Sequence, residues 1–337
     1  MVIRVENLTK VFKQRKGRVG ILGAFRDLGK REYKIIKAVD NVSFSIREGE
    51  IVGYIGPNGA GKSTTMKMLG GILVPTSGII EVNGLVPHKN RKENAKHIGV
   101  VFGQRTSLWW DIPLSESFSL QRQIYRIPEK TYQENMRIFS DILDLDKLLH
   151  APVRQLSLGQ RMRADIACAL LHNPSIVYLD EPTIGLDVVV KESIRTFIRE
   201  MNNLRSTTVL LATHDMSDVE KLCSRVIVIN QGQIMYDGSL DKLRNTYGNE
   251  EIIVLQTISP EPVELSYLKT IGVSAIEQNN NNISIRYNRN NVNSTAILGW
   301  LMQNVKLVDF KVKEAQIEDM IRVLYKGFSN KNQISGN

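Results

Sequence analysis

The first part of the chain alternates between apolar and polar residues in the manner of β-strands. Val2–Val5 and Val42–Ile46 alternate as strands with one buried face do, and the second ends in a turn at Arg47–Glu50. The almost wholly apolar stretch Ile51–Ile55 follows directly. Ser77–Gly84 has the pattern of a short strand closed by an Asn-Gly turn. These patterns predict a strand-rich beginning.

The middle of the chain carries apolar runs that no polar residue interrupts. Ile176–Leu179 and Thr208–Ala212 are of this kind, which suits central parallel strands buried on both faces. Ile98–Phe102 has the pattern of another strand. Residues 115–150 have a mostly helical period and predict a separate helical block. Strands that alternate with helices predict a doubly wound α/β core.

The composition changes after about residue 245. The pattern there predicts strands at 252–255, 283–287 and 305–312 and helices at 263–270, 293–303 and 316–326, with a hairpin loop at 278–282. We therefore expect a main domain at 1–245, with a helical subdomain at about 105–170, and an accessory α+β domain at 246–327. The polar residues 328–337 predict a disordered tail.

Length and composition exclude several classes of protein. The 337 residues contain no apolar stretch of about 18 residues, so we expect no membrane-spanning helix. The first residues lack the basic and apolar regions of a secretion signal. Two cysteines, Cys168 and Cys223, are too few for a disulfide framework or a zinc site. We expect both to be buried packing residues and the chain to work in the reducing cytoplasm.

The net charge of +9 is concentrated in one segment, residues 13–37, which hold nine basic and two acidic side chains. A basic segment of this kind favours nucleic acid or an anionic membrane face, and a solvated linker explains it equally well. Val19, Leu22, Phe25 and Leu28 recur at a spacing typical of an amphipathic helix, although four glycines oppose helix formation. Because large apolar residues interleave with the charges, we favour docking on the membrane or on a membrane partner over nucleic acid.

Residues 56–64, Gly-Pro-Asn-Gly-Ala-Gly-Lys-Ser-Thr, fit the phosphate-binding pattern G-x-x-x-x-G-K-[ST]. The loop follows an apolar strand and precedes a helical pattern, which is the context that the motif requires. Its backbone N–H groups and the helix N-terminus would surround phosphate oxygens. Lys62 would reach the β- and γ-phosphates and Ser63 would bind Mg²⁺. The sequence therefore predicts binding of a nucleoside triphosphate.

Two carboxylates follow the apolar run Ile176–Leu179. Asp180 stands where nucleotide hydrolases hold Mg²⁺. The neighbouring Glu181 could orient the attacking water or accept its proton. Downstream of a phosphate loop, this pair predicts a hydrolytic site.

Taken together, these motifs resemble the nucleotide-binding subunit of an ABC transporter over residues 1 to about 240. The matching elements, in family order, are the phosphate loop Gly56–Thr64, Gln104 of the glutamine loop, the signature-like Leu156–Gln160, Asp180 with Glu181, the D-loop Gly185–Asp187 and the switch histidine His214. The resemblance implies a phosphate-loop NTPase core with an antiparallel β subdomain and a helical subdomain.

The resemblance also assigns roles to single residues. Catalysis would depend on Glu181, His214 and Gln104, and Mg²⁺ would be bound by Ser63, Gln104 and Asp180. The loop residues expected to contact ATP are Gly56, Pro57, Asn58, Gly59, Gly61, Lys62, Ser63 and Thr64.

The family works as a head-to-tail dimer in which each ATP lies between one phosphate loop and the partner's signature motif. Ser157, Gly159 and Gln160 would therefore act on the partner's ATP. Leu158 departs from the family pattern, which has glycine there. The change is harmless if the backbone tolerates a side chain, and it weakens the contact if the position needs a positive φ.

Three aromatic positions have further expected roles. The family stacks an aromatic ring on adenine near the end of the first strand, where Phe12 lies, and Tyr33 is the alternative. Trp109 and Trp110 follow the glutamine loop, in the region that receives a helix of the membrane subunit. At least one of the two is expected at an interface, unless both pack inside the helical block.

The resemblance implies ATP hydrolysis coupled to transport through a separate permease, at the cytoplasmic face of the cell membrane. The appended C-terminal domain and the basic insertion resemble the type-2 exporter branch, so export is expected, of an undefined substrate. The alternative is a soluble ABC ATPase that acts on ribosomes or DNA, supported only by the basic segment. A small-molecule kinase does not explain Leu156–Gln160 or His214.

Overall fold

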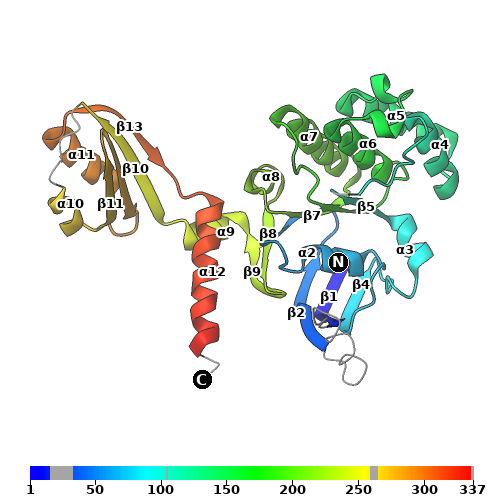
Figure 1. Cartoon of the computed structure of the whole chain (residues 1–337), viewed down its shortest axis with the longest axis horizontal. Helices are drawn as coiled ribbons and strands as arrows, with labels where there is room; N and C mark the ends of the chain where they lie inside the picture. Colours follow the sequence, from blue (N-terminus) through cyan, green and yellow to red (C-terminus); the bar gives the residue numbers. More distant parts are fainter. Residues whose placement is uncertain (16–32, 104, 259–264, 335–337) are drawn as a thin grey trace, which may run out of the picture. The chain divides into compact units, whose positions relative to one another are not determined.

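The computed structural model describes residues 1–15, 33–103, 105–258 and 265–334. The chain divides into two compact units, Met1–Asp237 and Gly238–Asn337 (Figure 1). The expected division into domains after residue 245 stays a prediction. Among the described residues, no helix combines the length and the apolar character needed to cross a bilayer.

The first unit is built around a six-stranded sheet in the order β5-β6-β7-β3-β8-β9. The neighbours from β5 to β8 in this order pair in parallel. Every residue of β6 and β7 is buried, as their uninterrupted apolar runs predict. The strands are β3 Ile51–Ile55, β5 Ile98–Phe102, β6 Ile176–Asp180, β7 Thr208–Thr213, β8 Arg225–Asn230 and β9 Gln233–Ser239. The predicted α/β core is confirmed.

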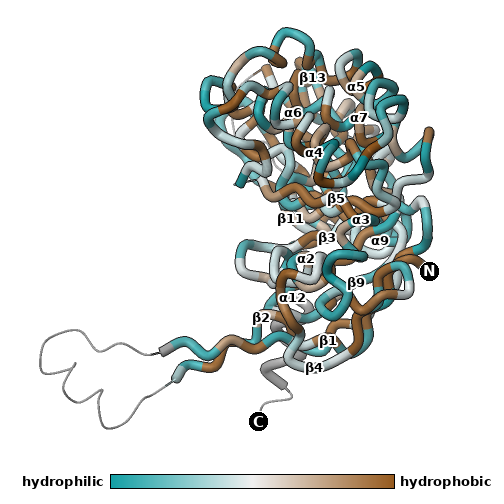
Figure 2. Tube along the Cα trace, turned by 90° about the vertical axis from the view of Figure 1, so that its right-hand side faces the viewer, coloured by the Kyte–Doolittle hydropathy of each residue, from teal (hydrophilic) through white to brown (hydrophobic). Residues whose placement is uncertain are grey.

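A second, antiparallel sheet has the order β2-β1-β4, formed by β2 Tyr33–Ile46, β1 Ile3–Arg15 and β4 Ser77–Val82. The first two strands are longer than the pattern predicts, because their pairing continues from Val11 opposite Lys37 to Arg15 opposite Tyr33. Figure 2 shows the two strands projecting together from the unit. The ends of the basic segment are therefore strands. The helical spacing from Val19 to Leu28 lies outside the described residues.

Helix α2, Lys62–Leu69, packs in the same core as both sheets. Its Met66, Met68 and Leu69 are buried together with Val5 of β1 and Tyr54 of β3. Because the helix begins directly after the glycine loop, this packing fixes the end of the helix that faces the loop.

The helical part of the first unit is held together by aromatic and aliphatic packing. Phe139 and Phe197 meet edge to face with ring centroids 5.0 Å apart, and Phe118 is fully buried. The helices are α3 Arg91–His97, α4 Leu114–Tyr125, α5 Glu129–Leu143, α6 Leu158–Leu170, α7 Val188–Arg205 and α8 Met216–Leu222, with short 3₁₀ turns at Asp146–Leu148 and Val153–Gln155. The helical block predicted over 115–150 is present as α4 and α5.

The second unit is an α+β fold around an antiparallel sheet in the order β11-β12-β10-β13. Its core lies between one face of this sheet and helices α10 and α11. The elements are α9 Leu240–Tyr247, β10 Glu250–Thr257, α10 Ser266–Thr270, β11 Val273–Asn279, β12 Asn282–Asn288, α11 Ser294–Asn304, β13 Leu307–Lys313 and α12 Ile317–Ile334. The sequence predicts disorder from residue 328, but helix α12 continues to Ile334. No proline in its last turns interrupts the helix.

His172 lies half-buried in the turn between α6 and β6. Its Nε2 lies 3.1 Å from the carbonyl oxygen of Ile98, and its ring stacks on Tyr125 with centroids 4.0 Å apart. Burial lowers the pKa of His172 to about 4. Since an unfolded histidine has a pKa of about 6.5, the unfolded chain takes up this proton first as the pH falls.

We expect the His172→Gln variant to lose less stability in acid than the wild type. Between pH 7.5 and pH 5 the free energy of unfolding of the wild type should fall by about 2 kcal/mol more than that of the variant, because in this pH range only the unfolded wild type gains a proton at His172. Urea unfolding of both proteins at the two pH values measures the difference. Equal losses would show that His172 titrates alike in both states.

Candidate functional site

The phosphate loop, residues 56–64, connects β3 to α2 and depends on glycine at two points. Gly61 has φ 107°, and a Cβ there would lie 2.3 Å from the carbonyl oxygen of Ala38. A Cβ on Gly56 would lie 2.4 Å from the carbonyl oxygen of Ile229. Side chains at these positions would push the loop away from its neighbouring strands. Thr65 fixes the start of the helix, because its hydroxyl donates to the Gly61 carbonyl at 3.1 Å.

Lys62 is the first residue of α2, and it is only 6 % exposed. Its Nζ donates to the carbonyl oxygens of Gly56 at 2.6 Å and Pro57 at 3.4 Å. The same nitrogen lies 3.6 Å from Oε1 of Glu181. The ammonium group therefore lies inside the curl of the loop, where phosphate oxygens would bind.

Asp180 ends β6 beside the loop and offers an oxygen without a partner. Its side chain is 8 % exposed, and Oδ1 is buried with no hydrogen-bond partner among the described residues. Burial raises the pKa of Asp180, and the hydroxyl of Ser63 opposes this by hydrogen bonding to the carboxylate. A free carboxylate oxygen beside a hydroxyl is a donor set that suits Mg²⁺. Gln104, the third expected ligand, lies outside the described residues.

Glu181 has a backbone conformation that is rare for a residue with a side chain. Its φ is 56°, and its N–H donates to the Ala212 carbonyl at 2.8 Å. A Cβ on Gly103 would lie 2.4 Å from the Glu181 carbonyl oxygen, so the residue that follows β5 and strand β7 both confine this turn. Left-handed backbone held in place in this way is typical of functional sites.

The Glu181 carboxylate lies between two nitrogen-bearing side chains. Besides the contact with Lys62, its Oε2 lies 2.7 Å from Nδ1 of His214, which follows β7. The carboxylate is 18 % and the imidazole 48 % exposed, so both reach the open space in front of the loop. The structure thus brings Lys62, Asp180, Glu181 and His214 together, as the motifs predict for one hydrolytic site.

Helix α7 braces the segments that carry Glu181 and His214, which the sequence analysis did not anticipate. Arg195 donates from Nε to Asp218 at 2.7 Å, and Thr183 donates to the same buried carboxylate. Lys191 pairs with Asp215, the residue after His214. Burial opposes ionisation of Asp215, but hydrogen bonds from Lys191 and Ser217 lower its pKa to about 2. The spacing of Lys191 and Arg195 by one helical turn was the available signal.

Lys62, Asp180, Glu181 and His214 line a cavity of about 670 Å³. It is large enough for a nucleotide-sized ligand. Sequence reasoning missed the contributions of Ala38, Phe102, Arg105 and Ile184. The residues that line the cavity are Ala38, Pro57, Asn58, Gly59, Ala60, Gly61, Lys62, Ser63, Thr64, Lys67, Ile72, Phe102, Gly103, Arg105, Asp180, Glu181, Ile184 and His214.

The signature-like segment forms the start of α6 and does not line this cavity. Ser157 caps the helix: its Oγ accepts from the Gln160 N–H at 3.3 Å, and Gln160 Oε1 accepts from the Ser157 N–H at 2.9 Å. Leu158 is the first helical residue, has no positive φ and is 39 % exposed. Its backbone therefore accepts a side chain. Gly159 packs against Val190, since a Cβ there would lie 3.3 Å from Val190 Cγ2.

The two candidates for adenine stacking lie on the projecting β1–β2 pair, and neither lines the cavity in the described structure. Phe12 is 38 % exposed, pairs across the strands with Ile36, and has the Lys10 ammonium 5.2 Å from its ring centroid. Tyr33 is 49 % exposed. The role of Phe12 stays a prediction.

We expect Phe12→Ala to weaken ATP binding about tenfold or more while inorganic triphosphate binds as before, because base stacking contributes about 1–3 kcal/mol. Tyr33→Ala is the matched control and should bind ATP like the wild type. Calorimetric titration with both ligands checks this. If Tyr33→Ala alone weakened ATP binding, the assignment would pass to Tyr33.

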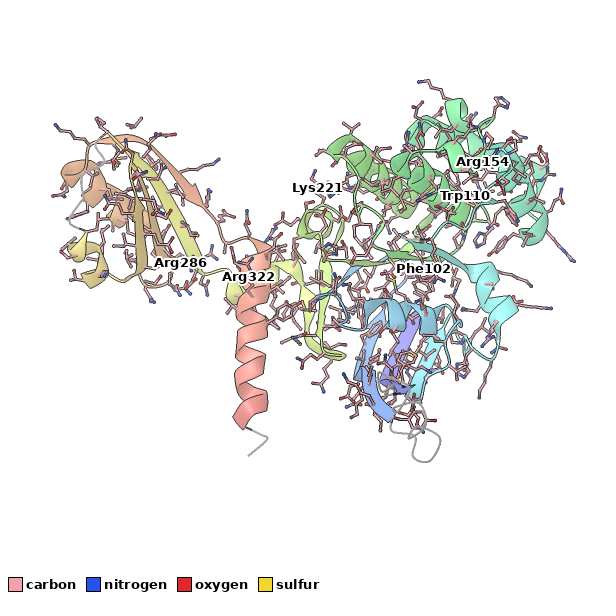
Figure 3. The ribbon with its side chains drawn as sticks, in the orientation of Figure 1. Phe102, Trp110, Arg154, Lys221, Arg286 and Arg322 are labelled. Carbon is pink, nitrogen blue, oxygen red and sulfur yellow. The ribbon has the colours of Figure 1, made fainter. Side chains whose placement is uncertain are left out.

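Trp109 and Trp110 are 40 % and 48 % exposed, so neither is packed inside the helical block. The guanidinium carbon of Arg161 lies 5.4 Å from the centroid of the Trp110 ring. The backbone N–H of Arg154 donates to the backbone carbonyl of Trp110 at 3.0 Å. Figure 3 shows Trp110 and Arg154 together in the helical part, apart from Phe102 at the end of β5. The pair forms a half-exposed aromatic surface.

Comparison with known proteins identifies the family. The model of the ABC transporter family matches residues 39–184. The ABC transporter ATP-binding protein NatA of Bacillus subtilis is 34% identical over 65% of this chain and 89% of NatA. The methionine import ATP-binding protein MetN of Geobacillus kaustophilus is 33% identical over 78% of this chain and 73% of MetN.

A solved structure with the same fold is a dimeric ATP-binding cassette in a post-hydrolysis state, with ADP and Pi bound. It is 28% identical, with a TM-score of 0.58, and the match covers 71% of this chain and 98% of that one. These relatives, the dimeric structure with the same fold and the motifs assembled around the cavity lead to one conclusion: this chain is an ATP-binding ATPase of the ABC transporter family.

Proposed function

We propose that this chain hydrolyses Mg²⁺-bound ATP to power export through a separate membrane permease, and that it works at the cytoplasmic face of the membrane. The observation that carries the proposal is the arrangement around Glu181. A phosphate loop, a carboxylate with a free oxygen and a histidine converge on one cavity, whereas the signature-like helix start lies away from it.

The residues around the cavity would have three separate roles: binding phosphate, binding Mg²⁺ and activating water. The backbone N–H groups of the loop and the ammonium of Lys62 would bind the β- and γ-phosphates. Ser63 and Asp180, with Gln104, would hold Mg²⁺, which supplies positive charge to the phosphate oxygens when it is bound. Glu181 would orient the attacking water and accept its proton, and His214 would hydrogen-bond the γ-phosphate.

The partner subunit would complete the site. Because Ser157, Gly159 and Gln160 lie at the start of α6 and outside the cavity, their proposed contact is with the ATP held by a second ATPase subunit. The capping box leaves the Ser157 hydroxyl hydrogen available, since Oγ acts there as an acceptor. Exposed apolar side chains at and near this helix start, Leu158, Val188 and Val189, suit a surface that a partner covers.

The permease is proposed to dock at the surface of Trp109 and Trp110. Two large, half-exposed indoles are a typical centre for a protein interface. Purification of the tagged chain from solubilised membranes of its host should yield a bound protein with membrane spans. The Trp109→Ala/Trp110→Ala variant should lose that protein and keep ATP binding. Recovery with ribosomes or DNA instead would favour a soluble ABC ATPase.

Export is proposed from the accessory C-terminal unit and the basic insertion, which resemble the type-2 exporter branch. Relatives of similar identity include an import subunit, so the direction needs its own test. In sealed inverted vesicles that contain the permease, ATP added outside should drive cargo inward. Cargo driven outward would show import.

The projecting β1–β2 pair is proposed to contact the anionic membrane or the permease. Its described part carries Lys13, Lys34 and Lys37 together with exposed apolar side chains, of which Ile35 is 65 % and Tyr33 49 % exposed. Each lysine near anionic lipid contributes up to about 1 kcal/mol. Residues 14–32, from the end of β1 to the residue before β2, add six basic side chains against two acidic ones. We expect a chain lacking residues 14–32 to sediment less with anionic vesicles, with or without permease, than the intact chain. If the intact chain and the shortened chain sedimented equally, the segment would be an insertion with no role in membrane or permease contact.

A further inference from the structure

Strand β13, Leu307–Lys313, is an edge of the sheet in the second unit, and within the described residues it pairs only with β10. Every residue from Val308 to Lys313 is exposed. Val308, Phe310 and Val312 are 60 %, 39 % and 40 % exposed. An exposed edge with apolar side chains is a template for pairing with another strand.

The backbone of β13 shows which residues are available to such a strand. The Phe310 N–H donates to Oδ1 of Asp309 at 2.8 Å. Phe310 lies opposite Leu255 and Val312 opposite Ile253 in one unbroken register, which shifts only between Asp309 and Leu307. Because alternate residues of an antiparallel strand turn their N–H and C=O groups to opposite sides, Phe310 and Val312 direct theirs to the same side, away from β10. A new strand would therefore bond first to these two residues.

The sequence of β13 is complementary to itself when two copies run antiparallel about Phe310. Phe310 then faces the partner's Phe310 in a hydrogen-bonded pair. Val308 faces the partner's Val312, and Asp309 faces the partner's Lys311, each twice by symmetry. Opposite charges and apolar side chains in directly facing positions stabilise a strand pair. In this register Lys313 faces the partner's Leu307, so no two like charges face each other.

We propose that a second copy of this chain pairs with it through β13, joining the two four-stranded sheets into one continuous antiparallel sheet. The association needs no nucleotide, because none of its contacts involve the phosphate loop or the signature helix. It therefore goes beyond the ATP-dependent dimer of the proposed function. On pairing, the Phe310 N–H exchanges its bond to Asp309 for a backbone carbonyl, and Asp309 becomes free for the partner's Lys311.

A charge exchange tests the register. In the full chain without nucleotide, Asp309→Lys places lysine opposite the partner's Lys311 at both symmetric positions. The dimer should become at least about tenfold weaker in sedimentation equilibrium, since two attractions turn into repulsions. Lys311→Asp should have the same effect. The Asp309→Lys/Lys311→Asp double variant restores opposite charges and should return to the wild-type dissociation constant.

Cysteine pairs test the same register without altering charge. In the proposed pair Val308 faces the partner's Val312, whereas the two copies of Val308 are four residues apart along the strands, about 13 Å. A disulfide requires Cα atoms within about 7 Å. Val308→Cys and Val312→Cys proteins should each stay uncrosslinked under mild oxidation, and their mixture should form a disulfide dimer. Cys168 and Cys223 are buried and should not interfere.

Two results would overturn the proposal. A wild-type chain that stays monomeric without nucleotide up to about 100 µM has no such contact, and Asp309 and Lys311 then serve only to protect the edge. A dimer that the single charge reversals leave intact, or whose mixed cysteine proteins fail to crosslink, uses another surface. Neither result bears on ATP hydrolysis, so the proposed function stands or falls separately.

Discussion

Replacing Glu181 by glutamine is expected to lower steady-state ATP turnover by about 10²–10⁴, the usual cost of losing a general base. Glutamine has nearly the same shape, so the turn at φ 56° and the hydrogen bond from its N–H to Ala212 should remain. What is lost is the negative charge next to the attacking water. ATP binding should persist, and ATP-bound dimers should accumulate.

The measurements are phosphate release under saturating MgATP and the oligomeric state with and without ATP. Glu48→Gln, the same change in an exposed turn, is the matched control and should turn over like the wild type. Turnover of the Glu181 variant at the wild-type rate would refute the assignment of the base. Loss of ATP binding as well would show that Glu181 serves to build the site.

The second large effect is expected from Lys62→Ala, which removes the cation inside the phosphate loop. We expect ATP to bind about 10–100-fold more weakly, because charge-assisted hydrogen bonds contribute about 1.5–3 kcal/mol. The variant also loses the donor to the Gly56 and Pro57 carbonyls, so the loop itself should become less ordered.

Fluorescence titration with a labelled ATP analogue measures this affinity directly. Lys96→Ala, which removes an exposed lysine from α3, provides the control and should bind normally. Thermal unfolding of both variants separates loss of affinity from loss of fold. If Lys62→Ala bound the analogue like the wild type, the nucleotide would have to bind elsewhere.

The parallel sheet was predictable from the sequence because a strand buried on both faces appears as an uninterrupted apolar run. The run Ile98–Phe102 coincides with β5, and the runs that begin at Ile176 and Thr208 are β6 and β7. The same apolar runs located the candidate site, because its two carboxylates and its histidine come at or directly after the ends of β6 and β7. Short motifs with fixed spacing supplied the rest.

Elements held by partners distant in sequence were harder to predict. The lengths of β1 and β2 depend on cross-strand pairs such as Phe12 with Ile36, which no local pattern reveals. Strand β11, Val273–Asn279, was missed because its residues alternate weakly and are recognisable only opposite β12. The network of Arg195, Asp218 and Thr183 was missed for a similar reason.

The pairing of Glu181 with both Lys62 and His214 has a consequence for how the site distinguishes its ligands. These two side chains are the proposed contacts of the γ-phosphate, so a triphosphate competes with the carboxylate for them. A diphosphate lacks the group that would draw His214 away, and it leaves Glu181 engaged. Glu181 would then be released to act as a base only when the ligand carries the γ-phosphate whose bond is to be broken. Recognition of the substrate and activation of the water would thus happen in one step.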